Sequence, residues 1–243
     1  MSKSKIMIEN LTQSYGNKEV LSNLSLEINR GLTGLIGRNG AGKTTLMKTL
    51  VTLLTPKSGN ITICNIPLKQ SKEIRKIIGY LPQEFSMYPS MKVWEVLDYL
   101  GVLSNMPKSL RRNRIEKLLV DVNLEKQRNK KVKALSGGMK RRLGVAQGLL
   151  HDPKVFIADE PTVGLDPEER VRLRHLLQDV SKEKIVLLST HIVEDIEAIA
   201  DEVAILEKGN IQYSGNTQVL METTGADSVE TAYLRIIQSK EVS

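Results

Sequence analysis

The sequence predicts an α/β protein with a mostly parallel β-sheet, an N-terminal antiparallel β part and an inserted helical subdomain. Three observations support this fold class. Short apolar runs alternate with segments of helical periodicity through most of the chain, which is typical of a parallel sheet covered by helices. The first part of the chain alternates apolar and polar residues, as half-buried strands do. From about residue 84 helical segments dominate, and strands return after residue 150.

The elements of the first half follow in order. "IMIENLTQSY" and "EVLSNLSLEI" predict half-buried strands, and "LTGLIG" predicts a short buried strand ending at Gly37. The helical stretch "RNGAGKTTLMKTLVTLL" should stop before Pro56, because proline cannot continue a helix. Strand "NITICN", helix "SKEIRKI" and strand "IGYLP" come next. The insertion then contains the helices "VWEVLDYLGVLS" and "RIEKLLVDVN".

The second half returns to alternating strands and helices. Strand "KVFIAD", helix "PEERVRLRHLLQDVSK", strand "KIVLLST" and helix "VEDIEAIA" precede a hairpin that turns at residues 208–210. The end of the chain is weakly helical. We therefore expect one domain over residues 1–225, with a helical subdomain inserted at about residues 84–150, and a C-terminal tail over residues 226–243.

Composition limits the classes of function. The chain has 243 residues, of which 40% are hydrophobic, so it can form a packed core. No apolar run approaches the roughly 18 residues of a transmembrane helix. The start, "MSKSKIMIEN", lacks the apolar region of a secretory signal, so a cytosolic chain is expected. Cys64 is the single cysteine, which excludes a disulfide framework within one chain, and we expect it in a strand.

The net charge of +7 leaves three interpretations open. The basic runs "LRRNR" and "KQRNKKVK" could form a solvated surface, could be attracted to an anionic membrane surface, or could contact nucleic acid. Neither run has interleaved aromatic residues on which bases could stack. We therefore expect no nucleic-acid partner.

The stretch "GRNGAGKT" fits the phosphate-loop pattern G-x-x-x-x-G-K-[ST] and lies between a predicted buried strand and a helix. Its glycines allow backbone N–H groups to surround a phosphate. Lys43 would reach the β- and γ-phosphate oxygens, and the hydroxyl of Thr44 would bind Mg²⁺. The candidate nucleotide-binding residues here are Gly37, Arg38, Asn39, Gly40, Ala41, Gly42, Lys43, Thr44 and Thr45.

Three further polar positions follow predicted strands. After "VFIA", Asp159 is a candidate Mg²⁺ ligand, and Glu160 could polarise a water for attack on the γ-phosphate. His191 follows another strand, at the sheet edge where ligands bind, and could donate to the γ-phosphate. Gln83 could contact Mg²⁺ or the attacking water, although alone it has no clear assignment. His151 and His175 lack such positions and are expected on the surface.

A second anion site is indicated by "LSGGMKRRLGVAQGLL". Ser136, Gly137 and Gly138 lead into a helix, so free N–H groups and the positive end of the helix dipole favour an anion there. The chain already has a phosphate loop, so these residues alone leave open whose phosphate the second site binds.

In order and spacing, these motifs resemble those of ATP-binding cassette (ABC) transporter ATPase subunits. The resemblance covers about residues 5–220 and includes "GLD", in which Asp166 lies, and "SYGNKEVL". It implies a P-loop NTPase core that binds ATP and Mg²⁺, with Tyr15 stacked on the adenine. Without the resemblance, a tyrosine at this position would more often pack in the core or in an edge strand. It departs from the family in Met139, where glutamine is common, and in Ala158, and neither departure affects a catalytic position.

The same resemblance implies a dimer, with a second copy or a paralogous ATPase subunit, that encloses two ATP molecules. Ser136, Gly137 and Gly138 would then bind the γ-phosphate held by the partner, and Asp166 would couple the two sites. Glu160 would act as general base, with His191 aligning it. The implied setting is the cytoplasmic face of the membrane, as a peripheral protein bound to integral transporter subunits.

Aromatic residues are concentrated next to Gln83. Of the nine in the chain, five lie within twenty residues, namely Tyr80, Phe85, Tyr88, Trp94 and Tyr99. They form the core of the helical subdomain, or a groove that accepts a helix of a membrane partner, and both can hold. The segment most resembles exporters of drugs, bacteriocins or similar amphiphiles. An importer subunit, a soluble ABC ATPase and a binding module without turnover are the alternatives.

Overall fold

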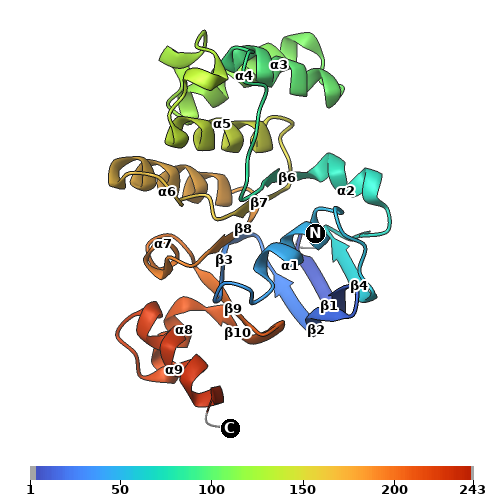
Figure 1. The fold of residues 1–243 in the computed structure, drawn as a ribbon, viewed down its shortest axis with the longest axis vertical. Helices are drawn as coiled ribbons and strands as arrows, with labels where there is room; N and C mark the ends of the chain where they lie inside the picture. The colour runs from blue at the N-terminus through green and yellow to red at the C-terminus, as the bar shows by residue number, and fades with distance from the viewer. Residues whose placement is uncertain (1–3, 242–243) are drawn as a thin grey trace.

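The computed structural model describes residues 4–241 and confirms the α/β class, with two sheets and helices around them (Figure 1). The smaller sheet is antiparallel, in the order β2 (Lys18–Ile28), β1 (Ile6–Tyr15), β4 (Ser58–Ile63) and β5 (Ile66–Pro67). The larger sheet has the order β10 (Asn210–Asn216), β9 (Glu202–Glu207), β3 (Gly31–Ile36), β8 (Ile185–Thr190), β7 (Val155–Asp159) and β6 (Ile78–Leu81). All its pairings are parallel except that of β9 with β10.

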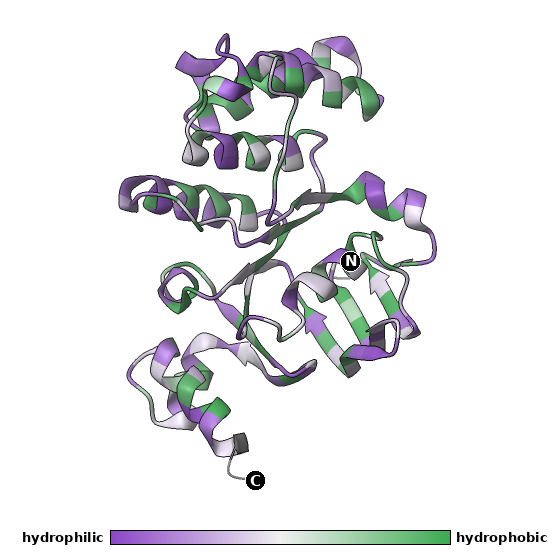
Figure 2. Cartoon of the chain, viewed as in Figure 1, coloured by the Kyte–Doolittle hydropathy of each residue, from purple (hydrophilic) through white to green (hydrophobic). Residues whose placement is uncertain are grey.

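The central strands are buried on both faces, which explains their continuous apolar runs. Successive side chains of a strand point to opposite faces. In β7, Val155 and Ile157 pack in one hydrophobic cluster with α1 and the antiparallel sheet, while Phe156 and Ala158 pack in the other cluster. Figure 2 shows the resulting concentration of apolar residues on the strands of the large sheet.

Besides two short 3₁₀ helices, Glu125–Gln127 and Val132–Ala134, nine α-helices accompany the sheets in the described part of the chain. They are α1 (Lys43–Leu50), α2 (Ser71–Ile77), α3 (Val93–Leu103), α4 (Lys108–Asp121), α5 (Gly137–Leu149), α6 (Pro167–Ser181), α7 (Val193–Glu197), α8 (Thr217–Thr224) and α9 (Val229–Glu241). Helices α3, α4 and α5 lie together at one end of the molecule (Figure 1). Within residues 4–241, none of these helices combines the length and apolar character needed to cross a membrane.

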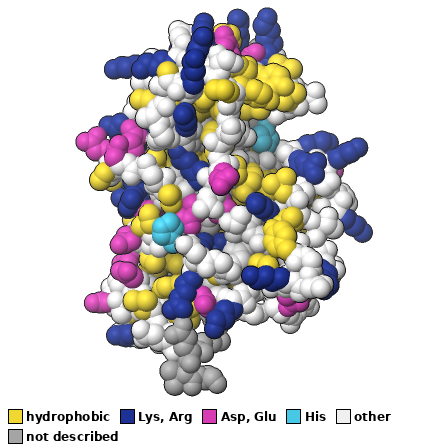
Figure 3. Space-filling model, viewed as in Figure 1, with side chains coloured by type: hydrophobic (Ala, Val, Ile, Leu, Met, Phe, Trp, Pro, Cys, Tyr) yellow, Lys and Arg dark blue, Asp and Glu magenta, His cyan; other side chains and the backbone are white. Residues whose placement is uncertain are grey.

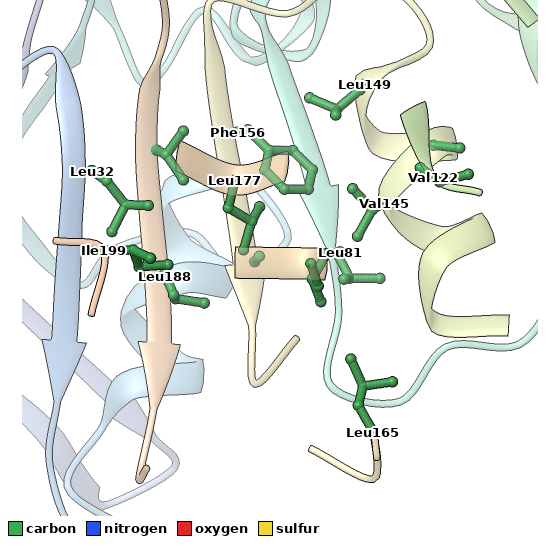
Figure 4. Close-up of a cluster of buried hydrophobic side chains, with 14 of the residues drawn as sticks. Leu32, Leu81, Val122, Val145, Leu149, Phe156, Leu165, Leu177, Leu188 and Ile199 are labelled. Carbon is green, nitrogen blue, oxygen red and sulfur yellow. The ribbon is translucent and has the colours of Figure 1, made fainter. Parts of the chain in front are cut away.

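Helix α5 lies unusually close to the large sheet. A Cβ at Gly148 would lie 2.5 Å from the ring of Phe156, and one at Gly79 in β6 would lie 1.9 Å from the Gly148 carbonyl oxygen. Only hydrogen fits at these two positions. In Figure 4 the Phe156 ring points toward Val145 and Leu149 of the same helix. The contact holds α5 firmly against β6 and β7.

Helix α1 is shorter than expected. It ends at Leu50, whereas the sequence predicted a helix that continues to Leu54, just before Pro56. Thr52 adopts a left-handed conformation, with φ 63°, and the amides of Leu53 and Leu54 turn back to the Lys48 carbonyl. Both bonds satisfy the Lys48 carbonyl near the helix end, and the chain turns away there.

The segment predicted as a tail after residue 225 contains α9, which packs against the core. Val229, Ala232 and Ile237 are buried in the larger hydrophobic cluster with residues of α7 and α8. The amide of Val229 also donates to the carboxylate of Glu197. These contacts lie on one helix face, so tertiary packing stabilises a helix whose sequence signal is weak.

Two single residues correct the sequence-based expectation. Cys64 lies in the turn after β4 rather than in a strand, because Cys64 and Asn65 both have positive φ, as a tight hairpin turn requires. His151 is half-buried rather than exposed, with Nε2 3.1 Å from the Ile78 carbonyl oxygen. His175 is exposed, as expected.

We expect the free energy of unfolding to decrease as pH falls below about 6.5, the ordinary pKa of histidine. Burial lowers the pKa of His151, although the Ile78 carbonyl and Asp152 raise it, and Arg114 and Lys184 lower it further. The unfolded chain therefore takes up this proton at a higher pH than the folded chain, so acid favours unfolding.

Urea denaturation at about pH 7.5 and about pH 5.5 measures this effect. The His151→Gln variant can still donate to the Ile78 carbonyl but does not titrate, so its stability should fall less between the two conditions. An equal decrease in the two proteins contradicts the assignment to His151.

Candidate nucleotide-binding and catalytic site

The phosphate loop connects β3 to α1. Gly42 immediately precedes the helix with φ 112°, and a Cβ at Gly37 would lie 2.2 Å from the Leu206 carbonyl oxygen. Both positions therefore require glycine. The ammonium group of Lys43 donates to the carbonyl of Gly37 at 2.6 Å and to that of Arg38 at 3.3 Å. The lysine is thus held across its own loop, at the N-terminus of α1.

Two acidic residues stand at the end of β7, beside β8. The pairing of these strands places Asp159 opposite Ser189. The Ser189 hydroxyl donates to Asp159 Oδ1 and accepts from the Glu160 amide at 3.1 Å. His191 Nδ1 lies 2.7 Å from Glu160 Oε2. Because an ionised carboxylate only accepts, Nδ1 carries the proton, and Nε2 is left to contact a ligand.

Electrostatics link the acids to the phosphate loop. Burial lowers the pKa of Lys43, while the carboxylates of Glu160, Asp159 and Glu207 act in the opposite direction. One oxygen of Asp159, Oδ2, is buried without a hydrogen-bond partner among the described residues. An unpaired carboxylate oxygen fits a Mg²⁺ ligand, and Mg²⁺ typically binds one or two carboxylates together with phosphates and waters. The described residues contain no group of three or more His, Cys, Asp or Glu side chains that could hold a metal ion, and this mode does not require one.

A hollow of about 630 Å³ opens over the loop and brings together eight of the predicted residues. Its lining includes Asn39, Gly40, Gly42, Lys43, Thr44, Thr45, Gln83 and Glu160. Gly37, Arg38 and Ala41 belong to the loop backbone but do not line this hollow, and Asp159 lies buried beneath. His191 reaches the site through its contact with Glu160.

Tyr15 does not line the hollow. It is 49% exposed at the end of β1, where it pairs with Lys18 of β2. Lys18, Glu19, Val20 and Lys208 do line the hollow, and the sequence interpretation did not single them out. Lys18, Glu19 and Val20 lie in the stretch "SYGNKEVL" beside Tyr15. The sequence therefore identified a stretch that lines the hollow, but not which of its residues do so.

Residues Ser136, Gly137 and Gly138 at the start of α5, called the signature segment below, do not line this hollow. Ser136 caps the helix, with its Oγ accepting from the Met139 amide at 3.2 Å, and no atom lies within 4 Å of a Cβ built on Gly137. A Cβ on Gly138 would lie 3.2 Å from Leu165, so the loop after β7 adjoins this segment. In that loop Asp166 caps α6, accepting from the Glu169 amide at 2.9 Å.

Sequence reasoning missed Arg141. It is buried in α5, and its guanidinium contacts the backbone of both the Gln83 segment and the Asp159–Glu160 segment. Nothing in a local pattern could identify it, because every acceptor is a main-chain carbonyl far away in the sequence.

The family model described as "ABC transporter" matches residues 21–163. The chain is 39% identical to the uncharacterised ABC transporter ATP-binding protein YxlF of Bacillus subtilis (strain 168), over 89% of this chain and 72% of the relative. It is 37% identical to the Nod factor export ATP-binding protein I of Cupriavidus metallidurans, over 93% of this chain and 76% of the relative. It is 30% identical to the linearmycin resistance ATP-binding protein LnrL of B. subtilis, over 92% and 73%.

Solved structures agree with the sequence relatives. An ATP-binding subunit of an ABC transporter superposes with a TM-score of 0.87 at 26% identity, covering 96% of this chain and 99% of that one. The ATP-binding cassette MJ0796, described as a dimer in a post-hydrolysis state bound to ADP and Pi, gives 0.79 at 25% identity, over 87% and 98%. The family model, the relatives and the solved structures agree, and this chain belongs to the ABC transporter family, as an ATP-binding and ATP-hydrolysing domain.

Proposed function

We propose that the chain is the ATPase subunit of an ABC exporter, dimerises around two MgATP molecules, and drives an amphiphilic or antibiotic- or peptide-like substrate through separate membrane subunits. The observation that best supports ATP hydrolysis is the position of the Glu160 carboxylate. It lines the phosphate hollow and is oriented by His191 from the neighbouring strand.

In the proposed reaction Glu160 accepts a proton from a water whose oxygen attacks the γ-phosphorus. The bond to the β-phosphate oxygen breaks, and ADP and phosphate leave. His191 holds the carboxylate through Nδ1 and offers Nε2 to the γ-phosphate. Lys43 and the loop amides stabilise the charge on the phosphates. Thr44, Gln83 and Asp159 would hold Mg²⁺, which neutralises phosphate charge when bound.

The dimer is supported by the position of the signature segment. Ser136 and Gly137 are exposed, and neither lines the hollow over the chain's own phosphate loop. A helix N-terminus with free amides attracts a phosphate. Because the N-terminus of α5 does not line the hollow of its own chain, it suits the phosphate of a nucleotide bound by a partner chain. MJ0796 is described as a dimer, which supports the same arrangement.

Export is supported by the names of two relatives, one for Nod factor export and one for linearmycin resistance. We place the chain at the cytoplasmic face of the membrane as a peripheral protein, with no nucleic-acid partner. Lys and Arg side chains spread over all parts of the face in Figure 3 and form no continuous basic surface there.

The aromatic cluster divides between core and surface. Phe85, Met87, Met91 and Trp94 pack against the larger hydrophobic cluster, while Tyr88 and Tyr99 are exposed with their rings edge to face at 5.3 Å. Figure 3 shows hydrophobic side chains over this helical end of the molecule.

We place the membrane subunit in a groove of about 600 Å³ between the end of α1 and the Gln83 segment. Leu53, Tyr80 and Phe85 provide apolar walls, and Arg75 and Glu84 provide opposite charges at the rim. An amphipathic helix suits such a groove. Because the segment forming one wall also carries Gln83, an occupant of the groove contacts the chain next to the nucleotide hollow.

The Leu53→Asp variant should lose membrane association but retain ATP hydrolysis. Leu53 is 62% exposed, so the change spares the core while placing a charge in an apolar contact. We expect about tenfold less protein to co-purify with its integral membrane subunit, as for an interface hot spot. The matched control is Val120→Asp, which is 58% exposed on α4 outside the groove. Equal recovery of the two variants contradicts the assignment of the groove.

Identification of the co-purified subunit, followed by transport in inverted vesicles, separates the alternatives. Uptake of substrate into inverted vesicles on addition of ATP supports export. Transport in the other direction identifies an importer, and absence of any integral subunit supports a soluble ABC ATPase.

A further inference from the structure

The buried side chain of Arg141 joins two segments of the candidate catalytic site, residues 82–83 and residues 159–161. It is 9% exposed, and no carboxylate of residues 4–241 lies within ion-pair distance of its guanidinium. Instead, Nη1 donates to two carbonyls at 2.8 Å each, Nη2 donates to two more, and Nε donates to a fifth at 3.2 Å. The acceptors are, in chain order, the carbonyl groups of Pro82, Gln83, Asp159, Glu160 and Pro161.

This geometry requires an arginine. The planar guanidinium has five N–H donors in a fixed fork, so the positions of the accepting carbonyls are fixed relative to one another. Burial lowers the pKa of Arg141, while the charges of Asp159 and Glu160 favour its cationic form. A lysine at this position offers a single ammonium point and cannot span the same acceptors.

Three of the five carbonyls that Arg141 binds belong to residues with proposed catalytic or metal-binding roles, Gln83, Asp159 and Glu160, and the other two belong to the adjacent prolines. Glu160 has φ 52°, a left-handed conformation that is unfavourable for a residue with a side chain and persists only when its surroundings hold it. Nη2 binds the carbonyls on both sides of that strained turn. Nη1 binds the backbone of Pro82 and Gln83, where the chain leaves β6.

The helix that carries the Arg141 guanidinium is held firmly against the large sheet. Arg141 lies in α5, which the close contact of Gly148 with Phe156 and Gly79 holds against the sheet. The next residue along the chain, Arg142, contacts different parts of the protein. Arg142 is also buried, but it binds the carbonyls of Val122 and Asn123, just after α4, and pairs with Glu169 of α6 at 2.7 Å.

We propose that Arg141 is a positioning residue that holds the backbone of Glu160 and Gln83 so that their side chains meet at the γ-phosphate. The proposal rests on the catalytic roles proposed above for these two residues. It assigns Arg141 no contact with the nucleotide.

The test compares Arg141→Gln and Arg141→Lys with the matched control Arg142→Gln. We expect the kcat for MgATP to fall about 100-fold in both Arg141 variants, with KM changed by less than about twofold, because displaced catalytic groups slow chemistry without weakening binding. Hydrogen exchange should increase in residues 82–90 and 159–165. The control should lower the unfolding temperature and leave kcat of the folded protein unchanged.

Chemical rescue separates positioning from stability. Millimolar guanidinium should restore part of the kcat of Arg141→Ala without raising its unfolding temperature, and methylammonium should not. The proposal is overturned by unchanged exchange in both segments, by an unchanged kcat in the Arg141 variants, or by an equal loss of kcat in Arg142→Gln. If the catalytic role proposed for Glu160 is wrong, a Glu160→Gln variant still hydrolyses ATP. That outcome does not change the hydrogen exchange expected in the Arg141 variants.

Discussion

Replacing Glu160 by glutamine should reduce the steady-state rate of ATP hydrolysis by about 1,000-fold, the usual contribution of a general base. The amide has the same shape, and its oxygen can still accept from His191 Nδ1, but it cannot take a proton from water. Binding of MgATP should persist, because Lys43 and the loop amides are untouched. Initial-rate phosphate release and equilibrium nucleotide binding measure the two effects separately.

The same variant should accumulate as an ATP-bound dimer, since hydrolysis no longer separates the subunits. Light scattering should show dimer in ATP and monomer in ADP. The control is Glu168→Gln, whose side chain is exposed on α6, and it should behave as the wild type. Full turnover by Glu160→Gln removes Glu160 as the base, and a monomer in saturating ATP contradicts the closed dimer.

Mixed dimers should show that each site combines two chains. Lys43→Ala removes the phosphate-binding ammonium group, and Ser136→Arg places a bulky cation at the N-terminus of α5, where it opposes the helix dipole. When one chain carries Lys43→Ala and the other Ser136→Arg, one composite site keeps both native residues. We expect that pair to retain at least about tenfold more activity than either homodimer.

The control puts both substitutions on one chain and pairs it with a wild-type chain. Each composite site then contains one damaged residue, although the pair carries the same two changes. Tandem-affinity purification of the mixed dimers followed by phosphate-release assays gives the comparison. If the two arrangements are equally inactive, Ser136 does not serve the nucleotide of the partner.

Much of this molecule follows from short-range patterns. Apolar alternation identified β1 and β2, and the glycine at position 209 marked the hairpin turn, where Lys208 and Gly209 both have positive φ. The phosphate loop is recognisable because the chain conformation itself demands glycine at fixed spacing. In each case the determinant lies within a few residues of its effect.

Other features depended on distant contacts. Helix α1 stopped at Leu50 through bonds that no helix-propensity rule anticipates. Helix α9 has a weak helical sequence and is held by the core that it covers. His151 became half-buried because the end of α5 lies against β6. These outcomes reflect packing energies, which depend on which elements meet.

The candidate site shows the same division. Residue types and spacing alone identified the loop, Asp159, Glu160 and His191 as candidates, because each lies at or just after the end of a strand, at one edge of a parallel sheet. Only the folded chain brings His191 within 2.7 Å of Glu160, leaves one Asp159 oxygen unpaired, and places Arg141 among five carbonyls. Those contacts join segments up to about eighty residues apart, and main-chain carbonyls are the same at every position, so a sequence carries no local signal for the arginine that holds them.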